Sequence, residues 1–320
     1  MFDFPFNWVP YKLTTKGGQI QCYWLNTYGE PFTEPFFDET ILKCKGLDAR
    51  YAAISSVSDV KMVTGWANQV SAVEPTAIIF HVSRCGSTLV SQLLATLSEN
   101  IVLAEVPFFD DVLRLPYKYQ EFDQPAITKL FTDAVKYYGQ KRTGKEHSLF
   151  IKTDSWHLFF YKQFRELYPT IPFIIMYRKP DEVFNSHRKQ PGMQAVNGLI
   201  EPQLFGFDAN EVANMHPDDY LVAVIESYFK QCLEIAVADS QCLLLNYNEG
   251  PMQIIEKIAA FTKTELTPQD ILKMTERSRY HSKRQGEVFS EVNNHQTHFK
   301  LDKAIELYNL LEEKRKTATL

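Results

Sequence analysis

The sequence predicts an α/β fold in which a central parallel sheet is flanked by helices. Short apolar runs recur along residues 76–320, stretches with helical spacing separate them, and 45% of the 320 residues are hydrophobic, enough to bury a sizeable core. Strands that alternate with helices connect through right-handed crossovers and therefore lie parallel. The expected strands are 77–82 (AIIFHV), 101–104 (IVLA), 149–152 (LFIK), 172–177 (PFIIMY) and 242–246 (CLLLN).

The first 75 residues differ from the rest of the chain. Gly17 and Gly18 predict a turn between two strand-like runs, and the second run, 20–25 (IQCYWL), is rich in strand-forming residues. An aromatic segment, 31–37 (PFTEPFF), follows it. We expect a β-rich N-terminal extension that packs on the main domain. The predicted boundaries are 1–75 for the extension and 76–320 for the main domain.

Composition and charge exclude several classes of protein. The net charge is −5 and the isoelectric point is near 5.9, whereas a general nucleic-acid binder carries a basic excess. The five cysteines form no CxxC pair, and no His/Cys cluster has zinc-ligand spacing, which predicts reduced thiols and no metal site. Residues 1–10 do not resemble a signal peptide, and no stretch approaches the ~20 apolar residues that span a bilayer. We therefore expect a cytoplasmic protein without a nucleic-acid partner or a membrane span, and no feature predicts its oligomeric state.

The loop after the first strand of the main domain has the composition of an anion-binding site. It reads SRCGST and leads directly into a helix, whose N-terminus offers unpaired N–H groups and the positive end of its dipole. Gly86 allows close approach of an oxyanion, and Ser87 and Thr88 add hydroxyl donors. Arg84 supplies a planar cation suited to phosphate or sulfate. We expect Cys85 to serve packing or backbone spacing rather than nucleophilic attack.

The same loop resembles a Walker A motif in register but lacks two of its residues. His81 stands where the first glycine of that motif lies, and Ser87 stands where its lysine lies. No acidic Walker B strand end is evident either. These differences disfavour hydrolysis of a magnesium–nucleoside triphosphate.

A second basic loop follows the strand 172–177. Arg178 stands at the end of this strand, and Pro180 and Asp181 suit the first turn of a helix. Ser186 lies about two turns into that helix. Arg178 and Ser186 together form a candidate binding site for a second phosphate, away from the first loop.

Both loops together resemble the sulfotransferases that use 3′-phosphoadenosine 5′-phosphosulfate (PAPS), and the tyrosylprotein and bacterial types most of all. SRCGSTL resembles their 5′-phosphosulfate loop and YRKPDEVFNS their 3′-phosphate motif, and the likeness extends over about 76–286. The resemblance implies a three-layer P-loop-NTPase-like fold and PAPS as co-substrate. It also implies a 5′-phosphosulfate site of Arg84, Cys85, Gly86, Ser87 and Thr88, and a 3′-phosphate site of Arg178 and Ser186.

The resemblance also implies catalytic residues. Glu105 directly follows the second strand, where the tyrosylprotein and related sulfotransferases carry the base that deprotonates the acceptor. A carboxylate there can take the proton if burial raises its pKa. His81 and His157 are the alternative bases. Lys152, at the end of the third strand, matches a lysine that would stabilise charge on the transferring group together with Arg84.

A basic segment near the C-terminus completes the expected site. Lys283 and Arg284 resemble the loop that closes over the 3′-phosphate in this family. The resemblance therefore implies transfer of a sulfuryl group from PAPS to a hydroxyl or amine of an unidentified small molecule or peptide. Two alternatives stay open: a P-loop-like small-molecule kinase, and a non-catalytic module that binds PAPS or its desulfated product.

Overall fold

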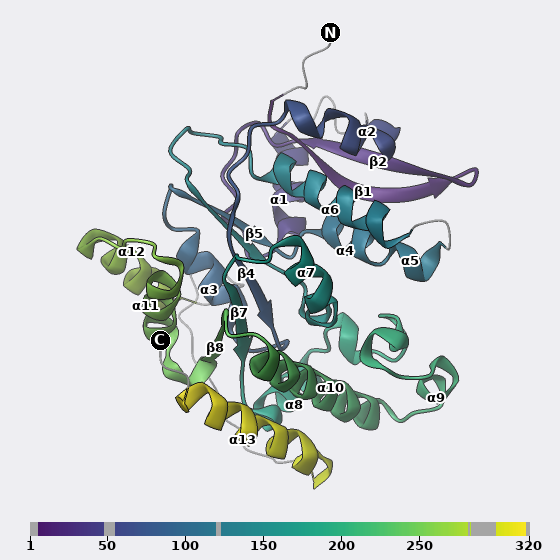
Figure 1. Cartoon of the computed structure of the whole chain (residues 1–320), viewed down its shortest axis with the longest axis vertical. Coiled ribbons are helices and arrows are strands. Elements are labelled where there is room, and N and C mark those ends of the chain that lie inside the picture. The colour runs from purple at the N-terminus through teal and green to yellow at the C-terminus, as the bar shows by residue number, and fades with distance from the viewer. Residues whose placement is uncertain (1–5, 48–54, 120–122, 281, 283–298, 318–320) are drawn as a thin grey trace.

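The central parallel sheet expected from the sequence is confirmed. The computed structural model describes residues 6–47, 55–119, 123–280, 282 and 299–317. Within them, five parallel strands pair in the order β5-β6-β4-β7-β8 (Figure 1). Each expected strand overlaps an observed one, and the ends differ by at most two residues. The observed strands are β4 (Pro75–His81), β5 (Asn100–Ala104), β6 (Ser148–Lys152), β7 (Phe173–Tyr177) and β8 (Cys242–Asn246).

The first strand of this sheet along the chain, β4, lies at its centre, between β6 and β7. The chain runs from β4 to the β5 edge, returns through β6, and then crosses to β7 and β8 on the other side. The loops after β4 and β7 therefore leave the same edge of the sheet in adjacent positions. Doubly wound sheets bind ligands at such a switch point, and it carries both candidate anion loops.

Alternate residues of the strands supply two separate cores, one on each face of the sheet. Ile78 and Phe80 of β4 belong to the first core, and Ala77 and Ile79 to the second. Because helices cover both faces, the strands read as continuous apolar runs (Figure 1). The second core includes α3 (Ser87–Leu94), α11 (Pro251–Thr262) and α12 (Pro268–Ser278), and the first includes α4 (Pro107–Leu113), α6 (Gln124–Tyr138), α7 (Tyr161–Leu167), α8 (Pro180–Lys189) and α10 (Pro217–Ala238).

The N-terminal residues form a small antiparallel sheet, as the sequence predicts. This sheet packs against α6 of the first core: the Tyr138 hydroxyl donates a hydrogen bond to the Pro10 carbonyl. The rings of Trp24 and Tyr137 meet edge to face, with centroids 5.2 Å apart. The elements of this part are β1 (Trp8–Lys16), β2 (Gln19–Asn26), α1 (Phe37–Leu47), β3 (Ser56–Asp59) and α2 (Lys61–Trp66).

The C-terminal helix α13 (Asp302–Thr317) packs on α10 and α8 and is bonded to the ends of two sheet strands. The Tyr177 hydroxyl at the end of β7 donates to Glu312 Oε1 at 2.6 Å. Asn246, at the end of β8, donates through Nδ2 to the Tyr308 hydroxyl at 2.9 Å. Helix α13 therefore supports the sheet edge from which the second anion loop leaves.

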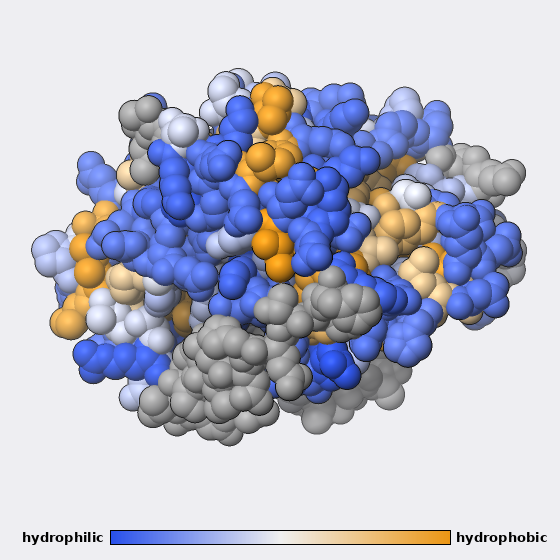
Figure 2. Space-filling model, turned by 90° about the horizontal axis from the view of Figure 1, so that it is seen from below, coloured by the Kyte–Doolittle hydropathy of each residue, from blue (hydrophilic) through white to orange (hydrophobic). Residues whose placement is uncertain are grey.

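Short helices fill the remaining connections. No helix in the described part of the chain is long and apolar enough to cross a membrane. Figure 2 views the molecule from below, the side of α13, and hydrophilic side chains cover most of the face that it describes. The short helices are α5 (Leu115–Lys118), α9 (Ala209–Ala213), η1 (Ala67–Gln69), η2 (Ser155–Phe160), η3 (Met193–Ala195), η4 (Pro202–Phe205), η5 (Tyr247–Glu249) and η6 (Phe299–Leu301).

Candidate active site

The loop between β4 and α3 has the backbone of an anion-binding turn. Arg84 and Gly86 have positive φ angles of 62° and 78°, a conformation that costs a non-glycine residue about 1–2 kcal/mol. A Cβ atom added to Gly86 would lie 2.3 Å from the ring of Tyr247, so a larger residue would have to displace that ring. Helix α3 begins at the next residue; the N–H groups of Leu89 and Val90 donate to the Gly86 carbonyl, and those of Ser87 and Thr88 precede the first hydrogen bond of the helix. The turn therefore offers donors and a positive dipole end to an anion.

The other residues of this loop are held inside the protein. The Cys85 side chain is fully buried, and its S–H donates to the Met176 carbonyl of β7 at 3.4 Å. Burial raises the pKa of this thiol to about 11, so it stays neutral and anchors the loop to the sheet. Only its backbone is available to a nucleotide. Ser87 and Thr88 open α3 and are 4% and 7% exposed.

Arg84 connects the first anion loop with the end of the second. Its guanidinium donates a hydrogen bond to the carbonyl of Gln190, just after α8. Burial lowers the pKa of Arg84, and the negative charge of nearby Glu105 opposes this effect. Arg84 thus lies between the two loops and within the electric field of the predicted base.

The second anion loop follows β7 and enters α8. Arg178 Nε lies 2.5 Å from Glu182 Oε2, one turn later on the helix. The Arg178 guanidinium also lies over the ring of Tyr247, 4.6 Å from its centroid. Ser186 is half-buried, two turns into α8. The predicted 3′-phosphate residues therefore share one loop and helix, with the guanidinium oriented by a carboxylate and an aromatic ring.

Tyr247 joins the two loops. Its ring lies against Gly86 of the first loop and under Arg178 of the second. It is placed by the turn η5 after β8, where the side chain of Asn246 accepts from Asn248 N–H and the carboxylate of Glu249 accepts from Asn246 N–H. This contact is not predictable from the sequence, since no residue near Tyr247 in the chain indicates that the Tyr247 ring reaches the β4 loop.

Glu105, which is half-buried, and Lys152 form an ion pair at the ends of β5 and β6, on the other side of β4. Lys152 Nζ donates to Glu105 Oε1, and the lysine side chain is fully buried. The Glu105 N–H donates to the Lys152 carbonyl at 2.9 Å, which extends the ladder between the two strands by one bond. Glu105 has a φ of 55°, a strained conformation of the kind found at functional sites. The structure thus brings together the predicted base and the predicted lysine.

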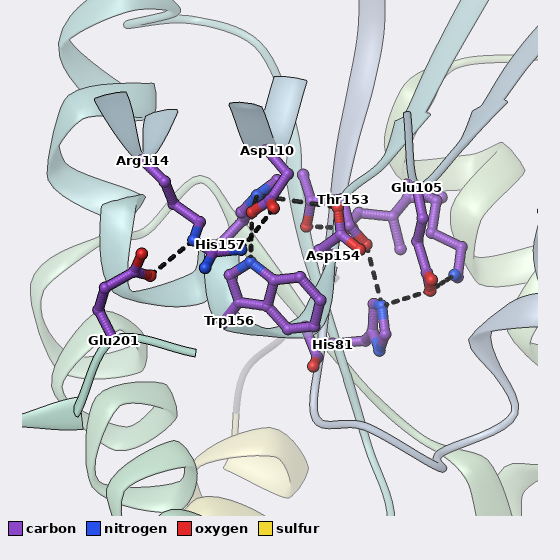
Figure 3. Close-up of polar contacts among 12 residues, drawn as sticks. His81, Glu105, Asp110, Arg114, Thr153, Asp154, Trp156, His157 and Glu201 are labelled. Atoms are coloured by element: carbon purple, nitrogen blue, oxygen red, sulfur yellow. Dashed lines mark hydrogen bonds and ion pairs between the residues drawn. The ribbon is translucent and has the colours of Figure 1, made fainter. Parts of the chain in front are cut away.

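Neighbouring charges, and not burial alone, set the pKa of Glu105. Burial raises its pKa, but the positive charge of Lys152 and a hydrogen bond from His81 outweigh burial, so the pKa falls below its usual value. His81 Nε2 lies 3.4 Å from Glu105 Oε1 and 3.0 Å from the Thr153 carbonyl. Burial and Lys152 lower the pKa of His81, which is therefore neutral at pH 7. Figure 3 shows the His81–Glu105 contact.

A second polar cluster, which the sequence does not reveal, lies beside this pair (Figure 3). Asp110 Oδ1 accepts from Trp156 Nε1 at 2.6 Å and lies 3.1 Å from His157 Nε2, and Asp110 Oδ2 accepts from Arg114 at 2.8 Å. Burial raises the pKa of Asp110, but these partners lower it to about 2. Asp154 Oδ2 lies 3.8 Å from His157 Nε2. His157, one of the alternative bases, is therefore committed to carboxyl groups other than Glu105.

The partners of this cluster lie far apart in sequence. Arg114 Nε also donates to Glu201 Oε2 at 2.6 Å, and Glu201 lies 87 residues later in the chain. The ligand atoms of Asp110, Asp154 and His157 all lie within 4.8 Å of one another, close enough to share a cation. One local signal exists: Asp154 follows Lys152 by two residues at the same strand end. Lys283 and Arg284, the last predicted site residues, lie outside the described residues.

Comparisons with known proteins show that the fold of this chain resembles those of several solved structures. No protein-family model matches the chain, and no curated protein matches it in sequence. Among solved structures, a sulfotransferase of Mycobacterium avium is similar at 13% identity and a TM-score of 0.48, with 81% of each chain covered. The sulfotransferase domain of the curacin biosynthetic pathway is similar at 14% identity and a TM-score of 0.46, over 78% of this chain and 93% of that one.

A third solved structure is retinol dehydratase, in complex with androsterone and the inactive cofactor PAP. It is similar at 12% identity and a TM-score of 0.33, over 83% of this chain and 90% of that one. Two of these three structures are sulfotransferases by name, and the likeness of this chain to all three is one of fold.

Proposed function

We propose that the chain is a sulfotransferase that transfers the sulfuryl group of PAPS to a hydroxyl or amine. The Tyr247 junction carries this proposal. The ring of Tyr247 contacts Gly86 of the first anion loop and Arg178 of the second, so two candidate anion-binding sites lie on either side of one side chain. A nucleotide that is phosphorylated at both its 3′ and 5′ positions needs two such sites.

The residues of the two loops suit such a nucleotide. Around the 5′-phosphosulfate, the cation of Arg84, the backbone at Cys85 and Gly86 and the first turn of α3 with Ser87 and Thr88 would bind oxygens. The 3′-phosphate would be bound by the Arg178 guanidinium and the Ser186 hydroxyl. Lys283 and Arg284 remain expected contacts of the same phosphate. We call the ends of β4, β7 and β8, with the side chains around them, the donor half of the site, and the ends of β5 and β6, with the side chains around them, the acceptor half.

The reaction would take place in the acceptor half. The acceptor oxygen or nitrogen forms a bond to sulfur while the bond from sulfur to the bridging phosphosulfate oxygen breaks, and that oxygen keeps the electron pair. The acceptor proton passes to Glu105, which is ionised because its pKa is lowered. Lys152 and Arg84 stabilise the negative charge that develops around the transferred group. Neutral His81, whose Nε2 lies 3.4 Å from Glu105 Oε1, would help to orient this carboxylate.

Calorimetric titration with three nucleotides tests the proposal. We expect 3′-phosphoadenosine 5′-phosphate (PAP), the desulfated product, to bind clearly more tightly than ADP or magnesium–ATP, because only PAP engages both loops. Preferential binding of magnesium–ATP would overturn the proposal in favour of a kinase. Tight PAP binding without turnover of PAPS across a broad panel of acceptors would instead leave a nucleotide-binding module.

A further inference from the structure

The acceptor half carries more carboxyl groups than cations. Lys152 pairs with Glu105, and Arg114 pairs with both Asp110 and Glu201. Asp154 and Asp38, which lie close enough to Glu105 for their charges to repel it, add two further carboxyl groups. In the described part of the chain, neither of these two pairs with a lysine or arginine. The half of the site that receives the acceptor is therefore short of positive charge.

Asp154 is the most constrained of these groups. It is 8% exposed, and its carboxylate accepts no hydrogen bond from the residues that the structure describes. Its nearest basic atom, His157 Nε2 at 3.8 Å, is already bonded to Asp110 at 3.1 Å. Figure 3 shows Asp154 between this cluster and the His81–Glu105 contact. A buried carboxyl group that no lysine or arginine contacts resists ionisation, and a ligand cation would favour its ionised form.

The N-terminal part of the chain also contributes side chains near Lys152 and Glu105. The ring of Phe36 lies 5.6 Å from Lys152 Nζ, a cation–π distance, so an aromatic face already meets an ammonium group at this point. Two residues later, exposed Asp38 opens α1 and faces the Glu105 charge. Aromatic and acidic side chains together are the composition that binds ammonium groups.

We infer that the acceptor carries an ammonium group, which Asp154 and Asp38 bind while its hydroxyl reaches Glu105. This inference rests on the proposed function and narrows its acceptor to small amino alcohols and aminophenols. The ligand ammonium supplies the positive charge that the described residues lack, while an anionic acceptor would be repelled by the same carboxyl groups.

Proton release should accompany binding of such an acceptor. Burial and the negative charges of Glu105 and Asp110 raise the pKa of Asp154 well above its usual value, with Asp38 adding to this and Lys152 opposing it. The free protein therefore resists ionisation of Asp154. A bound ammonium favours the ionised form, so the proton leaves as the ligand enters.

The experiment uses the full chain and three phenols that differ in charge. Tyramine is cationic, 4-ethylphenol is neutral and 3-(4-hydroxyphenyl)propionate is anionic. Each is titrated calorimetrically with and without PAP, in two buffers with different ionisation heats. We expect tyramine to bind at least ~10-fold more tightly than 4-ethylphenol, the propionate to bind most weakly, and protons to be released when tyramine binds.

Variants locate the effect. Asp154→Asn should abolish both the preference for tyramine and the proton release, and Asp38→Asn, at an exposed position, should reduce the preference. Glu39→Gln, on the neighbouring acid of the same helix, is the matched control and should change neither. Tyramine binding that is absent, no tighter than that of 4-ethylphenol, or still preferred in Asp154→Asn would overturn the inference.

The PAP titration separates the two proposals. If PAP binds but the preference for the cation is absent, the inference about the acceptor fails alone. If PAP does not bind but tyramine is preferred in the nucleotide-free protein, the cation site stands and the sulfotransferase proposal fails.

Discussion

The two halves of the site differ in how their charges balance. In the donor half, each of three carboxylates has a cation of its own: Glu182 pairs with Arg178, Glu312 with Arg315 and Glu249 with Lys257. In the acceptor half, Asp110 and Glu201 share Arg114, and Asp154 and Asp38 pair with no lysine or arginine among the described residues. A balanced set of charges stays ionised and rigid, whereas an unbalanced set changes its protonation when a ligand arrives.

The pKa values of carboxyl groups therefore shift in opposite directions in the two halves. The pKa of Glu312 is lowered to about 2, because hydrogen bonds from Arg315 and Tyr177 outweigh the effect of burial. The pKa of Asp154 is raised, because burial and like charges act together. We interpret the donor half as a preformed clamp for phosphate groups and the acceptor half as the place where protons move.

The largest expected effect is a loss of turnover when the acceptor half alone is altered. Glu105→Gln removes the group that accepts the proton, so turnover of PAPS to PAP should fall about 10²–10⁴-fold, while PAP affinity should change less than about twofold because the donor half is intact. Turnover is measured chromatographically with a panel of amino alcohols and aminophenols, and affinity by calorimetry.

The control for this variant lies on the same strand. Glu99→Gln changes a glutamate just before the opposite end of β5 and should leave turnover unchanged. Because Glu105→Gln leaves buried Lys152 without its carboxylate, thermal unfolding with PAP bound checks that the fold survives. Full activity of Glu105→Gln would place the base elsewhere.

A smaller effect breaks the contact between the two anion loops. Gly86→Ala forces a side chain into a positive φ and against the Tyr247 ring. Gly144→Ala is the matched control, since Gly144 has a φ of 82° and nothing within 4 Å of the added Cβ. Both variants should lose about 1–2 kcal/mol of unfolding free energy from backbone strain, but only Gly86→Ala should lose more than this and also weaken PAP binding. Equal effects of the two substitutions on both quantities would show that the Tyr247 contact is unimportant.

The smallest expected effect is on the pH dependence of stability, to which Glu312 of the donor half and Asp154 of the acceptor half should contribute in opposite directions. Because the pKa of Glu312 is lower in the folded state, its ionised form stabilises the fold above the ordinary value of 4.5, and this stability is lost as the pH falls toward about 2. Because the pKa of Asp154 is raised, its ionisation opposes folding, and wild type loses stability relative to Asp154→Asn as the pH rises above the ordinary 3.8.

Denaturant unfolding at several pH values measures both effects. The stability difference between wild type and Glu312→Gln should grow as the pH rises from about 2 to about 5, and the difference between wild type and Asp154→Asn should change in the opposite direction. Slopes of the same sign would contradict the assignment of opposite pKa shifts to the two halves.

The sequence predicts the sheet and the donor half better than the acceptor half, for a physical reason. Strands that are buried on both faces read as continuous apolar runs, as 172–177 does. The two anion loops are each contiguous, so the Arg178 loop and the Gly86 turn are visible locally. These elements are predictable because their chemistry lies within a few residues.

The acceptor half is assembled from segments that are distant in sequence. Asp110, Asp154 and Phe36 belong to three elements, and only the tertiary fold brings them to Glu105. The direction of the Glu105 pKa shift is not predictable from the sequence for the same reason: burial raises the pKa, but Lys152 is close enough to outweigh burial. Proximity between side chains of different strands is not encoded in local patterns.

The most direct test of the account compares two nucleotides that differ only in the 3′-phosphate, PAP and AMP, across three proteins. Calorimetric affinities are measured for wild type, Arg178→Ala and the control Arg188→Ala, an exposed arginine on the same helix. Charge-assisted hydrogen bonds contribute about 1.5–3 kcal/mol, so Arg178→Ala should remove about 10–100-fold of the preference for PAP over AMP and leave AMP binding nearly unchanged. Arg188→Ala should keep that preference. An equal loss of PAP and AMP affinity in Arg178→Ala, or an intact preference, would contradict the assignment of the donor half.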